Sequence, residues 1–405
     1  MSGILRVVWI LLWSLGILRA QEVRLGIDRL VELDFEPIRG KRIGLVTNPS
    51  GVDHQGRSTI DILYHAPGVR LVALFGPEHG VYGKVPAGEY VESHRDTATG
   101  LWVHSLYGKT RKPTSEMLRG LDAIVFDLQD IGNRSYTYIS TLGLVMEAAA
   151  DAGIEVLVLD RPNPLGGLRV EGPRLNPQWR SFVGQYDIPY VHGMTVGELA
   201  LWINRRHLSI PCRLRVIPMR GWRREMVWEA TGLRWIPTSP NIPNIAAARG
   251  YTVTGILGNI GITTITGDAF PFQVITTSYL DPERFTARLM RRNFHGIRAW
   301  PYHYRVETGR FKGSHYYGAR LRIDPYAQAN FTAFAFHAMD TIREMTGRNL
   351  FARVSANNLS MFDKLNGCSL WRIRWIRGQR AIDFERQWEP GVQAWLRERE
   401  AFLLY

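Results

Sequence analysis

The sequence contains little cysteine and lacks the short motifs of several common enzyme classes. Cys212 and Cys368 are the only cysteines among 405 residues, and their spacing fits no zinc site. They could pair in an oxidising compartment, but they lie far apart in sequence, so we expect two buried free thiols. HExxH is absent, and we expect no metal and no other cofactor. GxGxxG and GxSxG are also absent, which argues against a dinucleotide site and against a nucleophilic-serine hydrolase.

The sequence also has no long apolar run at its N-terminus. Residues 7–18 are apolar and follow Arg6, but this stretch is too short to span a bilayer comfortably. Leu18-Arg19-Ala20 before Gln21 forms an acceptable cleavage site. We therefore expect residues 1–20 to be a signal peptide and the mature protein to be periplasmic or secreted, without a stable membrane anchor. An uncleaved anchor is the alternative.

Acidic residues are fewer than basic ones. The 50 lysines and arginines against 37 aspartates and glutamates give a formal charge of +13. The arginines are scattered and the known nucleic-acid-binding spacings are missing, so we do not expect a nucleic-acid partner. A basic surface also fits an anionic polymer such as a bacterial cell wall.

Short apolar runs that end in Gly, Pro, Asn or Asp alternate with segments of helical period. This order predicts an α/β fold with a mostly parallel sheet covered by helices. After about residue 260 a strand–turn–helix order occurs twice, which predicts a smaller α/β or α+β domain. We expect one domain over 21–260 and a second over 261–405. The expected strands are 42–51, 69–80, 101–108, 121–130, 154–167 and 213–222, and the expected helices are 60–68, 114–121, 136–153 and 195–207.

Polar side chains follow four of the expected strands at the point where each strand ends. Ligands of parallel α/β sheets bind beyond the carboxyl ends of the strands, so these side chains predict a site. Carboxylates, amides and arginines suit a sugar or another polyol. The four groups begin at Asn48, Gly76, Asp127 and Asp160.

Glycoside cleavage needs a carboxylic acid that faces a second carboxylate. Glu78 fits the acid, because Gly76-Pro77 fixes its loop and the preceding apolar strand supplies a low-dielectric floor. A loop-pairing or helix-capping glutamate is the alternative. His79 either orients Glu78, binds substrate or is a hydrogen-bonded loop residue. The candidates for the second carboxylate are Asp127, Asp130, Asp160 and Glu171.

Seven motifs together give the chain a family resemblance. It resembles the exo-β-N-acetylmuramidase family (NamZ/YbbC-like, glycoside hydrolase family 171) over nearly the whole mature chain. The resemblance implies a Rossmann-like domain, a smaller C-terminal domain and an active cleft between them. It also implies release of N-acetylmuramic acid from the non-reducing ends of peptidoglycan fragments. The motifs are GLVTNPSGVD, LFGPEHGVYG, VFDLQDIGNRSYTYISTLG, LDRPNPLGG, VEGP, HGMTVGELA and PTSPNIPN.

The resemblance assigns roles to individual residues. The family's proposed catalytic pair corresponds to Glu78 in GPEHG and Glu171 in VEGP. An arginine in the sugar pocket could hold the lactyl carboxylate through a bidentate pair. The residues expected to line this pocket are Asn48, His79, Gln129, Asp130, Arg134, Tyr136, Asn163 and His192.

One segment departs from the family pattern. Where relatives carry a glutamate and an arginine before the second domain, residues 257–267 have Leu257 and Ile265. If this segment lines the pocket, charged contacts to the sugar are lost. The retained Glu78, His79 and Glu171 favour an active glycosidase, whereas the altered segment favours a diverged wall-fragment binding protein without hydrolytic activity.

Overall fold

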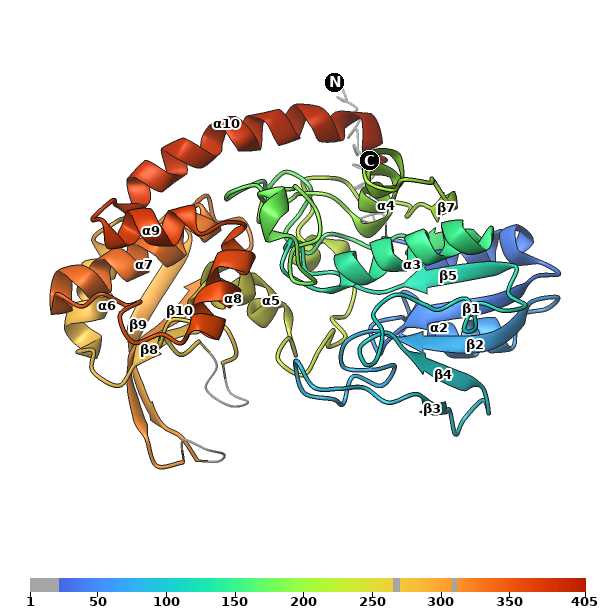
Figure 1. Ribbon diagram of the computed structural model, residues 1–405, viewed down its shortest axis with the longest axis horizontal. Coiled ribbons are helices and arrows are strands. Elements are labelled where there is room, and N and C mark those ends of the chain that lie inside the picture. The colour runs from blue at the N-terminus through green and yellow to red at the C-terminus, as the bar shows by residue number, and fades with distance from the viewer. Residues whose placement is uncertain (1–21, 265–269, 308–311) are drawn as a thin grey trace, which may run out of the picture.

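The computed structural model describes residues 22–264, 270–307 and 312–405, so the expected signal peptide lies outside the described residues. The chain forms a seven-stranded sheet followed by a three-stranded sheet, each covered by helices (Figure 1). In the described part of the chain, no helix combines the length and apolarity that crossing a membrane requires.

The seven-stranded sheet is parallel except at one edge, as the sequence predicts. Its order is β3-β4-β2-β1-β5-β6-β7, and only β3 runs antiparallel to its neighbour. All six expected strands are present. The strands are β1 (Arg42–Thr47), β2 (Arg70–Gly76), β3 (His94–Arg95), β4 (Trp102–Ser105), β5 (Ala123–Asp127), β6 (Glu155–Leu159) and β7 (Arg213–Ile217).

Helices cover both faces of this sheet, and their ends follow from the sequence. Thr195 and Glu198 form a capping box that begins α4 (Val196–Arg206). Gly153, with φ 66°, ends α3 (Tyr138–Ala152), because only glycine adopts this conformation without strain. The opposite face carries α1 (Gly26–Glu32) and α2 (Thr59–Tyr64). Single 3₁₀ turns are η1 (Glu36–Ile38), η2 (Pro177–Trp179), η3 (Trp228–Thr231), η4 (Gly255–Leu257) and η5 (Glu400–Phe402).

The second sheet has the order β8-β10-β9 and is antiparallel. The predicted strand–turn–helix repeat is confirmed, because β8 leads to α6 and β10 leads to α7. The strands are β8 (Val274–Thr277), β9 (Ile297–Arg305) and β10 (His315–Ile323). The helices of this part are α5 (Ile245–Thr254), α6 (Pro282–Met290), α7 (Phe331–Thr346), α8 (Ala356–Asn366), α9 (Leu370–Ile376) and α10 (Ala381–Arg399).

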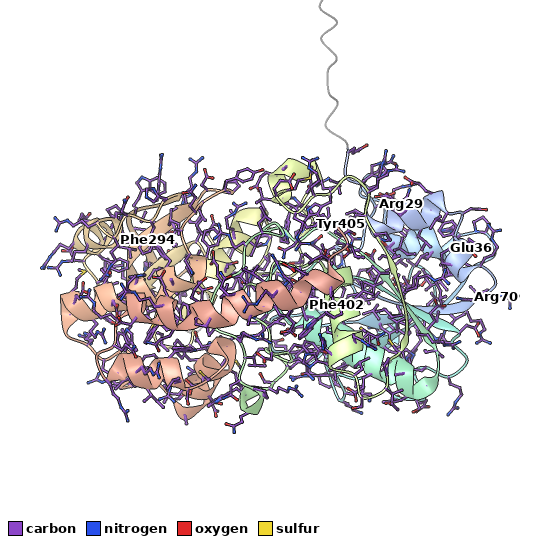
Figure 2. All side chains as sticks on the ribbon, turned by 90° about the horizontal axis from the view of Figure 1, so that it is seen from above. Arg29, Glu36, Arg70, Phe294, Phe402 and Tyr405 are labelled. Carbon is purple, nitrogen blue, oxygen red and sulfur yellow. The ribbon has the colours of Figure 1, made fainter. Side chains whose placement is uncertain are left out.

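Helix α10 joins the two parts of the molecule. It runs from the three-stranded sheet's helices to α4, where the C-terminus also lies (Figures 1 and 2). Phe384 and Trp388 pack in the core beneath α7, whereas Trp395, further along the same helix, packs in the core beneath α4. Tyr405 donates a hydrogen bond to Oδ2 of Asp160 at 2.7 Å, at the end of β6.

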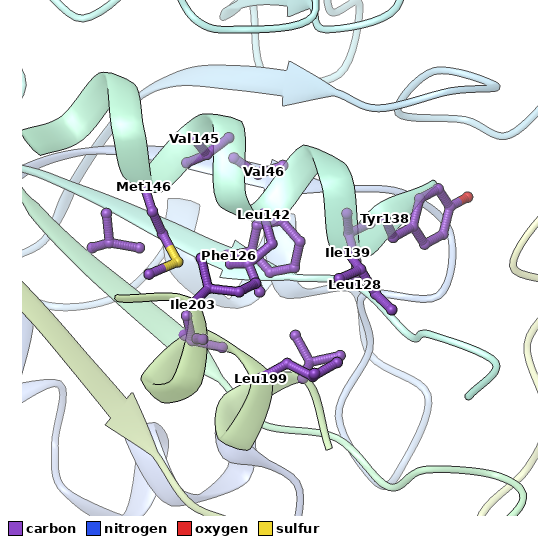
Figure 3. Close-up of a cluster of buried hydrophobic side chains, with 14 of the residues drawn as sticks. Val46, Phe126, Leu128, Tyr138, Ile139, Leu142, Val145, Met146, Leu199 and Ile203 are labelled. Carbon is purple, nitrogen blue, oxygen red and sulfur yellow. The ribbon is translucent and has the colours of Figure 1, made fainter. Parts of the chain in front are cut away.

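The apolar core lies on both faces of the seven-stranded sheet. On one face, Leu142 and Met146 of α3 and Leu199 and Ile203 of α4 pack around Phe126 of β5 (Figure 3). Successive residues of β5 and of β6 alternate between this cluster and the one beneath α1 and α2. Burial of both faces explains why the strands are continuously apolar in sequence.

One expected helix is wrong. Within 114–121, residues 115–120 form consecutive turns rather than a helix, although the hydroxyl of Thr114 accepts a hydrogen bond from the amide of Met117 as a cap would. Gly120 has φ 76°, which ends the turns before a helix can extend.

Candidate active site

The site lies at the point where the strand order reverses: after β1, the chain adds strands first on one side of β1 and then on the other. Strands β2 and β4 lie on one side of β1, and β5, β6 and β7 lie on the other. The β1 and β5 loops diverge at this point, and ligands of open α/β sheets bind in the crevice that results. Asn48, Glu78 and Thr137 follow β1, β2 and β5, respectively, at this edge.

The loop after β2 is built from tight turns that direct Glu78. The amide of Gly80 donates to the carbonyl of Pro77 at 2.9 Å. His79 has φ 72° and Gly80 has φ 77°, so two successive residues are left-handed. His79 is held in this strained conformation by its Nδ1, which lies 2.8 Å from the carbonyl oxygen of Val85. This contact agrees with one of the roles expected for His79, that of a hydrogen-bonded loop residue.

Glu78 is nearly buried and lies among hydroxyl groups. The Thr137 hydroxyl donates to Oε2 of Glu78 at 2.7 Å, and the amide of Gly88 donates to Oε1 at 3.0 Å. Burial, together with the nearby Glu78 carboxylate, raises the pKa of Tyr107 to about 12. Burial also raises the pKa of Tyr251, to which Glu78 adds a smaller effect. These tyrosines thus remain neutral donors beside the carboxylate.

Arg111 is a cation close to this group. Its guanidinium carbon lies 5.1 Å from the ring centroid of Tyr107 and 4.3 Å from that of Phe182. It is exposed, and it forms no salt bridge with a carboxylate of the described residues. Sequence reasoning missed both Tyr107 and Arg111. The available signal was SLYG at the end of β4, because this strand reaches the same edge of the sheet.

Glu171 has the contacts of a helix cap. Its Oε2 accepts from the amide of Phe331 at 2.7 Å and from that of Thr332 at 3.3 Å, at the start of α7. Arg169 donates to its Oε1. Burial raises the pKa of Glu171, although Arg169 and the two amides oppose this shift.

Among the residues that the structure describes, Glu78 and Glu171 share no hydrogen-bonding partner. Glu78 is held by Thr137 and Gly88, whereas Glu171 is held by Arg169 and the start of α7. The catalytic pairing of the two carboxylates therefore stays a prediction.

Two of the other candidates for the second carboxylate form the sheet edge itself. Asp127 forms a buried ion pair with Arg161, with Nε at 2.5 Å and Nη2 at 2.8 Å. Asp160 accepts from Gly197, Thr195 and Tyr405, and burial raises its pKa to about 6. Both aspartates thus stabilise loops.

Several residues expected to bind sugar are buried and hold neighbouring segments in place. The amide nitrogen of Asn48 donates to the hydroxyl of Tyr138 at 2.7 Å and to the carbonyl of Thr238 at 3.0 Å. The Tyr136 hydroxyl lies 2.7 Å from the Thr238 hydroxyl. These contacts attach the proline-rich connection over 235–245 to the sheet edge, close to Glu78.

The guanidinium of Arg134 binds three main-chain carbonyls. It donates to those of Pro173 at 2.6 Å, Ile188 at 2.7 Å and Leu365 at 2.9 Å. The side chain is 2% exposed, and burial lowers its pKa to about 10. Arg134 therefore joins the two parts of the chain, and this arrangement leaves little of it for a ligand.

The remaining expected pocket residues lie in the loops after β5 and β6. Gln129 donates to the carbonyls of Asp130 and Pro162, both at 2.8 Å, and Asn163 donates to that of Met194 at 3.0 Å. Nε2 of buried His192 lies 3.7 Å from Asp130 Oδ2, and neither this nitrogen nor Asp130 Oδ1 has a partner among the described residues. These two groups retain unused hydrogen-bonding capacity.

The departure from the family pattern at Leu257 does not affect the site around Glu78. The Leu257 side chain is fully buried in the apolar cluster beneath α7, so the expectation of a lost charged contact has no support at this position. Ile265 lies outside the described residues.

Asp28, Asp53 and His54 are the described side chains whose arrangement could hold a metal, with ligand atoms within 4.8 Å of one another. His54 Nδ1 instead lies 2.7 Å from Asp28 Oδ1, and Arg57 donates to Asp53 at 2.6 Å. These internal partners already occupy the ligand atoms. Cys212 and Cys368 are free thiols, and burial raises the pKa of Cys212 to about 11.

Comparison with known proteins agrees with this architecture. A crystal structure of a DUF1343 family protein from Bacteroides fragilis NCTC 9343 is 43% identical, with a TM-score of 0.88 over 95% of this chain and 99% of that one. A second DUF1343 structure from the same organism is 26% identical, with a TM-score of 0.72 over the same shares.

The sequence comparisons identify the family. The peptidoglycan beta-N-acetylmuramidase NamZ of Bacillus subtilis (strain 168) is 38% identical over 384 residues, which cover 95% of this chain and 92% of that protein. Family models for the N-terminal and C-terminal domains of exo-beta-N-acetylmuramidase NamZ match residues 43–246 and 249–405. The chain therefore belongs to the exo-β-N-acetylmuramidase NamZ family.

Proposed function

We propose that this protein is an exported glycoside hydrolase that releases N-acetylmuramic acid, or a related amino sugar, from the non-reducing ends of peptidoglycan fragments. The observation that carries the proposal is the 38% identity, over nearly the full length of both chains, to a protein named for β-N-acetylmuramidase activity on peptidoglycan. The family models and the carboxylate at the switch point support it.

In this proposal Glu78 is the general acid. A glycosidase acid protonates the leaving oxygen as the glycosidic bond breaks, while charge develops on the sugar ring. Thr137 and Gly88 fix both carboxyl oxygens of Glu78, so the group is already oriented before substrate binds. The neutral hydroxyls of Tyr107 and Tyr251 can donate hydrogen bonds to sugar oxygens beside it.

The second carboxylate that the family resemblance implies is Glu171. Its role would be that of a base or a nucleophile on the opposite side of the sugar ring. Its raised pKa and its three donors describe a buried, firmly held carboxylate. Comparing the stability and the activity of Glu171 variants separates a reacting group from a helix cap.

Arg111 is our candidate for the lactyl carboxylate of muramic acid, in place of Arg134. Its guanidinium lies against Tyr107, whose hydroxyl faces Glu78, and its donors are free of carboxylates among the described residues. A bidentate contact there would distinguish N-acetylmuramic acid from N-acetylglucosamine, which lacks the lactyl group.

The test is hydrolysis of a chromogenic 4-nitrophenyl β-N-acetylmuramide by purified protein, with the matching N-acetylglucosaminide for comparison. We expect the muramide to be cleaved faster. Failure to cleave any aminosugar glycoside would refute the proposal and favour a wall-fragment binding protein.

The remaining parts of the proposal concern location and partners. Export rests on the N-terminal sequence, and N-terminal sequencing of the mature protein tests it. The proposed function requires neither nucleic acid nor a membrane anchor.

A further inference from the structure

The three-stranded sheet has a cavity of about 700 Å³ on the face away from α6 and α7. Side chains alternate along β10, so Leu321 and Ile323 enter the core while Arg320 and Arg322 are exposed on the other face. Arg249 of α5 and Glu229 close one side of the cavity.

Aromatic rings form a row on this face. Trp300 of β9 pairs in register with Arg320 and is 45% exposed, and Tyr302 and Tyr304 follow on the same side of the strand. Tyr302 stacks on Tyr304 at 5.9 Å, and Tyr304 stacks on Tyr316 of β10 at 5.5 Å. From Trp300 to Tyr304 the row extends about 13 Å at the usual rise of a strand. It therefore suits an extended ligand made of rings.

The cavity carries an excess of positive charge. Arg249 is paired with Glu229 at 2.7 and 2.8 Å, but Arg320 and Arg322 have no carboxylate partner among the described residues. The guanidinium of Arg320 lies over Phe270, with its central carbon 3.6 Å from the ring centroid. Arginines held against rings bind carboxylates with defined geometry.

We propose that this cavity and its aromatic row form a second carbohydrate site, separate from Glu78, that binds a carboxylate-bearing stretch of a peptidoglycan chain. The apolar faces of the sugars stack on Trp300 and Tyr302. Free carboxylates, either of lactyl groups that carry no stem peptide or of the stem peptides themselves, pair with Arg320 and Arg322. The inference rests on the proposed function, because it supplies the polymer that Glu78 would trim.

One short segment contacts both sites. The ring of Phe272 packs on Tyr251, the neighbour of Glu78, at 4.9 Å. The ring of Phe270 lies 6.0 Å from that of Tyr302, and Gln273 lines the cavity. This proximity is why we favour a glycan, held by the row and cut at its end, over a single-stranded nucleic acid.

The experiment is isothermal titration calorimetry on the Glu78→Gln protein, which prevents turnover. The probes are a four-sugar peptidoglycan fragment with stem peptides and the same fragment without them, whose lactyl carboxylates are free. They are compared with the neutral N-acetylglucosamine tetramer and a single-stranded oligonucleotide, and the fragment that binds more tightly identifies the source of the carboxylate. We expect Arg320→Gln/Arg322→Gln and Trp300→Ala each to weaken fragment binding at least tenfold. Arg305→Gln, which removes an exposed arginine from the other face of β9, is the control and should change nothing.

Kinetics separate this inference from the proposed function. In the otherwise wild-type protein, Arg320→Gln/Arg322→Gln should leave cleavage of the small muramide unchanged while raising KM for the long fragment. Unchanged affinity in both variants, or tighter binding of the oligonucleotide than of the fragment, would overturn the inference. If the wild-type protein cleaves no muramide, the proposed function fails, but calorimetry still reports on the cavity.

Discussion

Replacing Glu78 and Glu171 separately by glutamine should affect the stability of the protein differently. Glu78→Gln keeps an acceptor for Thr137 or Gly88, so its melting temperature should stay close to that of the wild type. An amide cannot donate the acid proton, and loss of a general acid lowers kcat by about 10²–10⁴-fold.

Glu171→Gln should instead destabilise the protein. Breaking a buried ion pair by removing one partner costs roughly 3–5 kcal/mol. The glutamine amide oxygen can still accept from the amide of Phe331, and Arg169 still donates to the carbonyls of Ala327 and Ala329. We therefore expect a cost in the lower part of this range. The melting temperature should fall by about 5 °C or more.

The assays are differential scanning fluorimetry and kcat/KM on the chromogenic muramide, at a temperature where every variant is folded. Glu89→Gln, an exposed change in the Glu78 loop, is the control. If Glu171→Gln melts like the wild type, Glu171 does not stabilise the start of α7 as its contacts indicate. Wild-type kcat/KM in Glu78→Gln would remove Glu78 from the mechanism.

Three further outcomes are expected. Tyr405→Phe removes a donor to Asp160 and leaves the amide of Met219 without its acceptor, so it should cost about 2–3 kcal/mol in urea unfolding. The cost should be larger above pH 6 than at pH 5, because the acceptor is an ionised carboxylate only above the raised pKa of Asp160; a cost independent of pH would contradict this. Arg111→Gln should raise KM for the muramide about tenfold without affecting the glucosaminide, with the neighbouring Lys109→Gln as control; an equal effect on both sugars would exclude the lactyl contact. N-terminal sequencing of exported protein should begin near Gln21, and a full-length chain in the membrane would contradict signal cleavage.

The sequence predicted β1, β2, β5 and β6 because burial on both faces makes them largely apolar, whereas the two-residue, exposed β3 carries no such signal and was not expected. It also predicted the carboxyl edge as the site, since loop residues such as Asn48 and Glu78 must meet there. It could not separate ligand-facing from structural side chains. Arg134 and Tyr136 look the same in the sequence whether they bind a ligand or hold the structure together. Only their contacts with Pro173, Leu365 and Thr238 show the structural role.

The role of α10 in joining the two cores could not be predicted from local sequence patterns either. Helix α10 was not among the elements expected from the sequence, and local periodicity cannot show that Trp388 and Trp395 enter different cores. Tyr107 and Arg111 were missed for a similar reason, because strand β4 is short and its position beside β2 follows from the assembled sheet.

Helix α10 also restricts how the molecule can deform. Any rotation of the three-stranded sheet against the seven-stranded one must bend this helix or pull one of its tryptophans from a core. Pro390 lies between Trp388 and Trp395 and removes one main-chain hydrogen bond, so bending is least costly there. Opening and closing around a glycan would then be a hinge motion of α10 at Pro390. A force applied to one half of the molecule would be transmitted to the other half through this helix.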